Sequence, residues 1–371
     1  MVGQALGFAL DAAGLLISLG ITLEAAKSPP PSAFTSVQII SGSGPNSQAG
    51  GNVPHMAIWD DDGNRIGQYH PKKNAKHKED FGKTYAIEHN QNGGKPADPY
   101  YIMLSNLGND AICISSATVS NEKISGTFYG DTGAACGQSW FLSETSIGTG
   151  FTKPKCVWLD ADHSNKINAR ALSFHPNDMA PNPDKLDQYN AHKKTLCKST
   201  PRFSFWGNLL PDRIIPFFKP KLTYNIDSGG AGQGNDTDMA RVIDKPGQYD
   251  KSVYLNQGEK TKRSTQIKRR NVQGSNKDPG HLIVTDHPGD DVRKVCESET
   301  SFGWDIVSTV QNLFCDVEVK QLYPLCHESV KDNCFDLDGK IVVPKSGIEA
   351  RDQFASAITP KNYTSEAHGN V

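Results

Sequence analysis

Motifs for several common chemistries are missing from this sequence. No pair of cysteines has the CxxC spacing of zinc ribbons or dithiol redox sites, and no serine lies in a GxSxG nucleophile motif. The glycine-rich run over residues 229–234 matches neither GxGxxG nor a P-loop ending in GKS or GKT. These absences favour a non-enzymatic role. An enzyme that uses none of these motifs stays an alternative.

The chain also lacks an excess of charge of either sign. Its 371 residues include 39 Lys and Arg against 41 Asp and Glu, a net charge of −2. Nucleic-acid binders normally carry a basic excess, so we expect no nucleic-acid partner. Hydrophobic residues make up 36%, below the usual level of about 45–50%. This composition excludes a collagen, a coiled coil, a polytopic membrane protein and a wholly disordered chain.

Cationic residues are missing from the start of the chain, because no Lys or Arg precedes Lys27. Residues 4–23 are the most apolar stretch, long enough to cross a bilayer as a helix. A secretory signal has a cationic start, an apolar middle and a small-residue cleavage site. Residues 1–26 supply only the last two. They fit a removable leader, a helix packed on the protein body, or a helix that contacts a membrane.

The cysteines give the clearest indication of the cellular compartment. Eight cysteines fall into two groups of four: Cys113, Cys136, Cys156 and Cys197, then Cys296, Cys315, Cys326 and Cys334. An even count without metal spacing predicts four structural disulfides, which we expect to form within each group. The 105 arithmetically possible pairings stay open. Paired cysteines predict an oxidising, extracellular destination.

Other short signals agree with a secretory route. Asn235 and Asn362 each begin a glycosylation sequon. The dibasic pairs Lys262-Arg263 and Arg269-Arg270 are either processing sites or parts of a solvated basic loop.

Residues 34–175 predict many short strands separated by turn residues, without crossover helices. This pattern is typical of an antiparallel β-sandwich of the jelly-roll or C2/PLAT-like kind. The predicted strands are Phe34–Ile40, Met56–Trp59, Thr84–His89, Tyr100–Ser105, Ala111–Ser115, Ser125–Tyr129, Ser139–Ser143 and Cys156–Asp160.

The rest of the chain predicts less regular structure. Residues 176–280 are polar and dotted with proline, so we expect an irregular region. Residues 281–345 predict a disulfide-stapled α+β region, with a buried strand His281–Thr285 and a short helix capped by Asp290 or Asp291. Residues 346–371 read as a flexible polar tail.

Two loops contain clustered carboxylates. Asp60 and Asp62 precede Gly63, and such a cluster can serve either a calcium loop or a hairpin turn; we favour the turn. In the second loop, Asp160, Asp162 and a serine occupy positions one, three and five of a twelve-residue calcium loop.

The second loop departs from the EF-hand pattern at two positions. Position six is Asn165 rather than glycine, and position twelve is Ala171 rather than glutamate. We therefore expect either a partial calcium site or a polar turn after a strand. Calcium is the only cofactor that the sequence suggests. His70, His77 and His89 match no metal spacing, and a solvated loop is the expected setting for them.

The cysteine contexts carry a family resemblance. Residues Cys156-Val-Trp158-Leu-Asp160, and in the tail Cys296, Phe314-Cys315-Asp316, Tyr323-Pro-Leu-Cys326 and Cys334-Phe335-Asp336, are the ones concerned. Over about residues 34–343 the chain resembles uncharacterised secreted proteins of filamentous ascomycete fungi. The resemblance implies secretion, paired cysteines and a role at a host or microbial surface. The leader departs from an ordinary fungal signal at Asp11 and in lacking an early cation.

These observations give one leading functional hypothesis and two alternatives. The leading hypothesis is a secreted, effector-like binding protein that recognises a glycan or cell-surface ligand through long polar loops. The alternatives are an extracellular hydrolase of a polymeric substrate and a membrane-active toxin that inserts residues 4–23.

Overall fold

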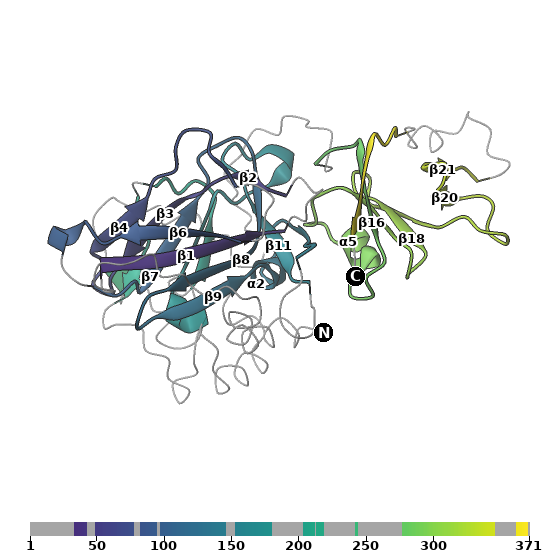
Figure 1. The fold of residues 1–371 in the computed structure, drawn as a ribbon. Helices are drawn as coiled ribbons and strands as arrows, with labels where there is room; N and C mark the ends of the chain where they lie inside the picture. Colours follow the sequence, from purple (N-terminus) through teal and green to yellow (C-terminus); the bar gives the residue numbers. More distant parts are fainter. Residues whose placement is uncertain are drawn as a thin grey trace. The chain divides into compact units, whose positions relative to one another are not determined.

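The computed structural model describes residues 33–42, 49–77, 82–94, 97–145, 153–179, 203–211, 213–218, 242–243, 277–345 and 361–369. The chain divides into two compact units, Met1–Ile267 and Lys268–Val371, shown in Figure 1. Strands dominate both units, and the mainly β class predicted from the sequence is confirmed.

The two large sheets of unit 1 are both antiparallel. The first sheet has the order β10-β11-β8-β1-β6, with β9 added beside β8, and the second has the order β13-β12-β7-β3-β4. The strands of the first sheet are β1 (Phe34–Ser41), β6 (Lys83–Glu88), β8 (Ile112–Ser120), β9 (Ser125–Tyr129), β10 (Trp140–Leu142) and β11 (Lys155–Leu159). Those of the second are β3 (His55–Trp59), β4 (Arg65–Tyr69), β7 (Tyr101–Ser105), β12 (Ala171–Phe174) and β13 (Phe203–Trp206).

Aromatic rings join the two sheets into a sandwich. The ring of Phe128 on β9 stacks against Phe174 and Phe203 of the second sheet, with centroids 5.9 and 5.5 Å apart, and meets Phe205 edge-on. All four side chains are fully buried. Such pairs add specific geometry to the burial of a large apolar area, so this contact fixes how the two sheets face each other.

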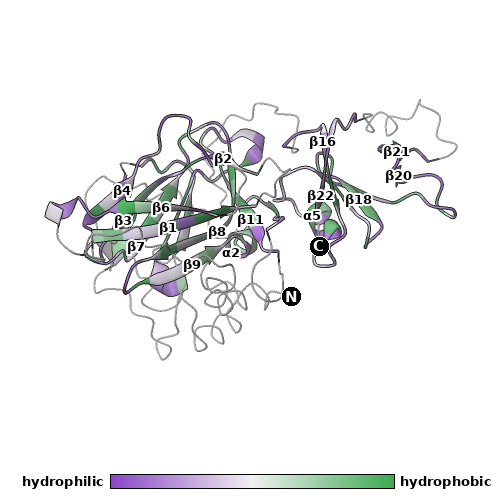
Figure 2. Cartoon of the chain, in the orientation of Figure 1, coloured by the Kyte–Doolittle hydropathy of each residue, from purple (hydrophilic) through white to green (hydrophobic). Residues whose placement is uncertain are grey.

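The second sheet is covered on both of its faces. Its outer face packs against Leu209, Ile215 and Phe217, which follow β13 in the chain. Strands β3 and β7 are therefore buried at every position, and they read as continuous apolar runs. In contrast, β6 alternates between exposed and buried residues because one of its faces is open. Figure 2 shows hydrophobic residues gathered on the strands and hydrophilic ones in the connections.

Unit 2 contains a mixed five-stranded sheet with the order β19-β18-β17-β16-β22. The helices and strands of unit 2 are β16 (His281–Thr285), α5 (Val292–Glu297), β17 (Asp305–Ser308), β18 (Leu313–Asp316), β19 (Gln321–Pro324), β20 (Cys334–Asp336), β21 (Ile341–Val343) and β22 (Ser365–Gly369). Strand β16 runs parallel to both β17 and β22. Asp291 caps α5 as predicted, its carboxylate accepting from the Lys294 amide.

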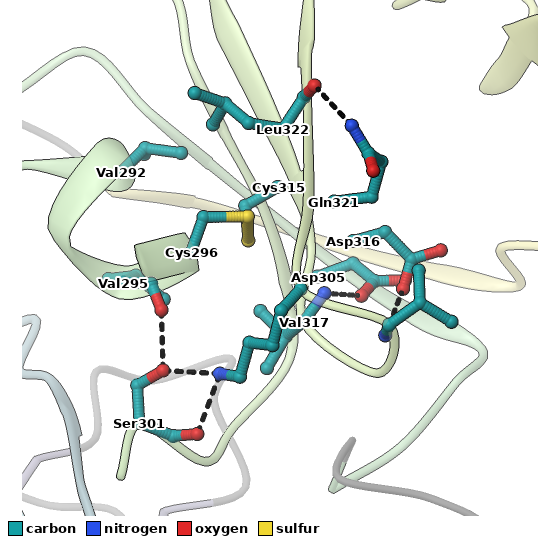
Figure 3. The surroundings of a disulfide bond; sticks show 12 residues. Val292, Val295, Cys296, Ser301, Asp305, Cys315, Asp316, Val317, Gln321 and Leu322 are labelled. Atoms are coloured by element: carbon teal, nitrogen blue, oxygen red, sulfur yellow. Dashed lines mark hydrogen bonds between the residues drawn. A yellow bond between two sulfur atoms is a disulfide. The ribbon is translucent and has the colours of Figure 1, made fainter. Parts of the chain in front are cut away.

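Disulfides staple each unit separately. Cys113 pairs with Cys156 in unit 1, linking β8 to β11. In unit 2, Cys296 on α5 pairs with Cys315 on β18, as Figure 3 shows, and a third bond joins Cys326 to Cys334. These three bonds confirm pairing within each predicted group. Cys136 is also in a disulfide, and Cys197 lies outside the described residues.

Two boundary predictions need correction. The polar region 176–280 includes β13, which completes the second sheet of unit 1 by pairing with β12. Its aromatic run forms a buried strand because the rings pack into the sandwich core. The expected flexible tail 346–371 is not flexible at its described end: β22 pairs in register with β16. Small helix α2 (Gly130–Ala135) was also not predicted.

One carboxyl group in unit 1 is expected to make stability fall as pH rises. Asp131 lies in the first turn of α2, and burial, opposed by the charge of Lys155 and backbone hydrogen bonds, raises its pKa to about 6. Because the folded state binds the proton more tightly than the unfolded state, this contribution is full below about pH 4 and lost as pH rises through about 6.

The substitution Asp131→Asn isolates that effect. We expect it to raise the free energy of unfolding at pH 7 by up to about 3 kcal/mol and to change little at pH 4. Urea unfolding at both pH values measures the difference. An equal effect at pH 4 and pH 7 would show that ionisation of Asp131 is not the cause.

Candidate functional site

The two predicted carboxylate loops lie at opposite ends of unit 1. Asp60 follows Trp59, which pairs with Tyr101 at the start of β7. Asp160 follows β11, and its amide donates to Ala169 beside the end of β7, where Ser105 pairs with Ala171. Five residues of β7 separate the two positions, so the structure does not bring the two loops together.

Residues 60–64 form the turn of the β3–β4 hairpin, the interpretation favoured from the sequence. The Asp60 carboxylate accepts from the amides of Asp62 and Asn64 at 3.0 and 2.8 Å, and from the Asn64 side chain at 3.0 Å. Gly63 has a φ of 76°, the left-handed conformation that such a turn requires. The carboxylate of Asp60 thus stabilises its own turn.

The loop over residues 160–170, here called the Asp160 loop, connects β11 to β12. Asp160 is fully buried, and its Oδ2 accepts from the hydroxyl of Ser164 at 2.8 Å. Asp162 is exposed, and its Oδ1 accepts from the Ser164 amide at 2.9 Å. No N–H or O–H group of the described residues donates to Oδ1 of Asp160. The loop therefore surrounds a carboxylate that is only partly satisfied.

Three residues of the loop have a left-handed backbone without being glycine. The φ angles are 56° at His163, 55° at Asn165 and 65° at Lys166. Each costs roughly 1–2 kcal/mol for an ordinary side chain, somewhat less for asparagine. Such conformations persist only where the surroundings enforce them, and they cluster at functional sites.

Neighbouring loops hold the Asp160 loop in place. Buried Asn106 donates its side-chain amide to the Leu159 carbonyl at 2.8 Å. The imidazole of His163 bonds to the Ile167 carbonyl at 3.1 Å and to the Asn208 side chain at 2.9 Å. The loop is thereby tied to the segments that follow β7 and β13.

The two carboxyl groups of the loop have opposite pKa shifts. Burial, reinforced by the neighbouring carboxyl of Asp162 and opposed by the Ser164 hydroxyl, raises the pKa of Asp160 to about 6. At Asp162, burial acts in the same direction, but hydrogen bonds from Ser164 and Asp160 hold its pKa below the usual value. Asp162 stays ionised, and Asp160 is the group that takes up a proton first.

Arg170 interacts electrostatically with Asp160. Burial lowers the pKa of Arg170, while the charge of Asp160 opposes that shift. Within the described residues, Arg170 forms no ion pair with Asp160, and its Nε has no hydrogen-bond partner. Among the described residues, no cationic side chain therefore neutralises the buried charge of Asp160 by direct contact.

In the described ranges, no group of three or more His, Cys, Asp or Glu side chains is arranged to hold a metal ion. The Asp160 loop offers two carboxylates and one hydroxyl group.

The predicted solvated setting of the histidines is wrong for two of the three. His77 and His89 are buried; His77 bonds to the Tyr85 hydroxyl at 3.1 Å and His89 to the Thr35 hydroxyl at 2.8 Å. Burial lowers the pKa of His77 to about 4, with Lys83 adding to the shift. His70 is exposed, as predicted. His77 is buried because β5 (Lys76–His77) turns the lysine-rich segment back against β2 (Gly51–Asn52). His89 is buried at the end of β6, where it lies beside the start of β1.

The predicted modification sites fall in different places. Asn362 is exposed, between Lys361 and Tyr363, whose side chains both bond to buried Asp305. Alternation along the extended chain thus points Asn362 to solvent. Asn235, both dibasic pairs and residues 4–23 lie outside the described residues. In the described part of the chain, no helix is long and apolar enough to span a membrane.

Several features of the site were not found from the sequence. Neither Asn106 nor Asn208 belonged to a motif, because each contacts the loop only after distant strands pair. Arg170 stood in a polar stretch without spacing to indicate a partner. The one available signal was Asn165, since asparagine tolerates the left-handed conformation better than other side chains.

Comparisons with known proteins identify no family. No family model and no curated protein matches the chain. Among solved structures, a match was found to a structure titled "Crystal structure of Delta413-417:GS I805A LOX", with 12% identity and a TM-score of 0.24. It covers 53% of this chain and 23% of that one.

Proposed function

We propose that this chain is a secreted binding protein that recognises a glycan at a cell surface, using the Asp160 loop and the adjoining Asn208. The observation that carries the proposal is the set of three left-handed, non-glycine residues in that loop. A conformation this costly, tied to the segment after β13 by the bond between His163 and Asn208, supports a preformed recognition surface.

The side chains on this surface suit a ligand rich in hydroxyl groups. Asp162, Lys166, Asn168 and Asn208 are exposed, and His163 is partly exposed. Together they supply carboxylate, ammonium, amide and imidazole groups, which can donate to and accept from sugar hydroxyls. Loops at one end of a sandwich commonly carry recognition because the strands beneath them are rigid.

The cysteines support an extracellular setting. Three disulfides within the described residues indicate an oxidising environment, because cytosolic proteins rarely keep such bonds. Export through a secretory pathway is the extension that we propose, and the exposed sequon at Asn362 is compatible with it.

A matched pair of lysine substitutions tests the glycan proposal. Lys166 lies in the Asp160 loop, whereas exposed Lys123 lies beyond Ser120, at the other end of β8. We expect the natural chain to bind a defined set of glycans on an array. Lys166→Ala should weaken that binding about tenfold or more, the loss of one charged hydrogen bond, and Lys123→Ala should leave it unchanged.

Two results would contradict the proposal. One is the absence of glycan binding by the natural chain at any array position. The other is an equal loss in both lysine variants, which would place the ligand elsewhere or make binding a general effect of charge.

The hydrolase alternative finds less support at this site. A glycosidase needs two carboxyl groups that both reach the scissile bond. Only Asp162 is exposed; Asp160 is fully buried and cannot touch a polymeric substrate in this conformation. The toxin alternative depends on residues 4–23 and stays a prediction.

A further inference from the structure

We propose that the Asp160 loop binds one divalent cation, calcium by preference, through the carboxylates of Asp160 and Asp162 and the hydroxyl of Ser164. The site would be a metal centre in a loop between two strands rather than an EF-hand. The experiment that tests this proposal measures calcium binding alone. Its result therefore does not depend on whether the loop binds a glycan.

The first observation is the unsatisfied oxygen of Asp160. This side chain has no exposed surface, yet no donor among the described residues reaches its Oδ1. Burying a carboxylate oxygen away from water without a donor is costly, and native structures rarely leave such an atom unpaired. A bound cation would supply the missing partner.

The second observation is that one residue joins the two carboxyl groups. Ser164 donates its hydroxyl to Oδ2 of Asp160 at 2.8 Å and its amide to Oδ1 of Asp162 at 2.9 Å. Both carboxylates are therefore held beside the same hydroxyl group, and oxygen atoms of these kinds are the ligands that calcium favours.

The backbone also accounts for the absence of glycine at position six of the loop. Position six of a calcium loop is usually glycine because the chain turns sharply there. Asn165 occupies that position with a φ of 55° and a ψ of 28°, so it adopts the left-handed conformation itself. The loop therefore makes the required turn without glycine.

The ligand set predicts weak, calcium-selective binding. Ala171 stands where an EF-hand has its bidentate glutamate, so backbone carbonyls and water must complete the shell. Arg170 and His163 add nearby positive charge in their protonated forms. We expect a dissociation constant of about 10⁻⁴–10⁻³ M, the range of extracellular calcium modules. Magnesium demands stricter geometry and should bind less well.

Calorimetric titration of the full-length, metal-stripped protein with calcium chloride tests the site, with thermal unfolding as a second readout. The natural chain should bind one calcium per chain, and its Tm should rise by several degrees at saturating calcium and fall again with EDTA. Asp162→Asn removes a ligand from an exposed position and should weaken binding at least tenfold. Asp62→Asn, the same change in the opposite hairpin, should have no effect.

Three outcomes would overturn the proposal. The first is a natural chain with neither calcium-dependent heat nor a change in Tm. The second is an Asp162→Asn variant that is folded, as shown by its circular dichroism, and binds calcium normally. The third is an Asp62→Asn variant that loses the binding instead, which would move the site to the β3–β4 hairpin.

Discussion

Replacing Lys361 with methionine is expected to destabilise unit 2 by about 3–5 kcal/mol, because it leaves a buried charge without its partner. The ammonium group of Lys361 lies 2.8 Å from Asp305 and 2.6 Å from Asp316. Asp305 is fully buried, and burial raises its pKa while Lys361 opposes that shift. Denaturant unfolding followed by hydrogen exchange of peptides from residues 277–345 reports on unit 2.

A second lysine provides the matched control. Lys340 forms a surface ion pair with Glu366 on β22. Lys340→Met should cost at most about 1 kcal/mol, the usual value of an exposed pair. A double variant, Lys361→Met with Asp305→Asn, should regain part of the lost stability because the buried charge is gone. Equal losses from Lys361→Met and Lys340→Met would contradict the assigned role of Asp305.

Removing the Cys113–Cys156 disulfide is expected to cost unit 1 about 4 kcal/mol. The bond closes a loop with a sequence separation of 43 residues between buried strands β8 and β11. A loop of this length loses more chain entropy on cross-linking than a short one, which is the origin of the estimate. Guanidinium unfolding of the double Cys→Ala variant measures it.

The Cys326–Cys334 bond is the natural comparison, since its sequence separation is only 8. Its double Cys→Ala variant should lose about 2–3 kcal/mol, and the loss should fall on unit 2. A larger loss at the shorter loop would show that contacts of the sulfur atoms, rather than loop closure, govern the stability of these bonds.

The strands of unit 1 could largely be predicted from local pattern. All eight expected strands between residues 34 and 160 are present, because each is a β-branched or aromatic run bounded by turn residues. Strand β4 was missed since it contains Gly67. A side chain there would meet the backbone of Glu88, so glycine marks a close approach between strands rather than a turn.

Longer-range pairing was harder to foresee. Pro211 and Pro216 made the segment after β13 look irregular, yet its apolar side chains cover the outer face of the second sheet. The C-terminal strand β22 carries few apolar residues. It is held by pairing with β16 and by the bonds from Lys361 and Tyr363 to Asp305, none of which local sequence can reveal.

The candidate site shows the same limit. Spacing located Asp160 and Asp162, but not the burial of one and the exposure of the other. That difference separates their pKa values, and it arises because Asp160 continues a buried strand while Asp162 lies on the turn. The supporting contacts of Asn106 and Asn208 depend on strands far away in the sequence.

The oxidising setting and the two stapled units both depend on the cysteines being cross-linked within each unit. Peptide mapping of the purified, unreduced protein by mass spectrometry tests it directly. The expected linked peptides join Cys113 to Cys156, Cys296 to Cys315 and Cys326 to Cys334. Unmodified thiols at these positions, or bonds between the two groups, would contradict the account.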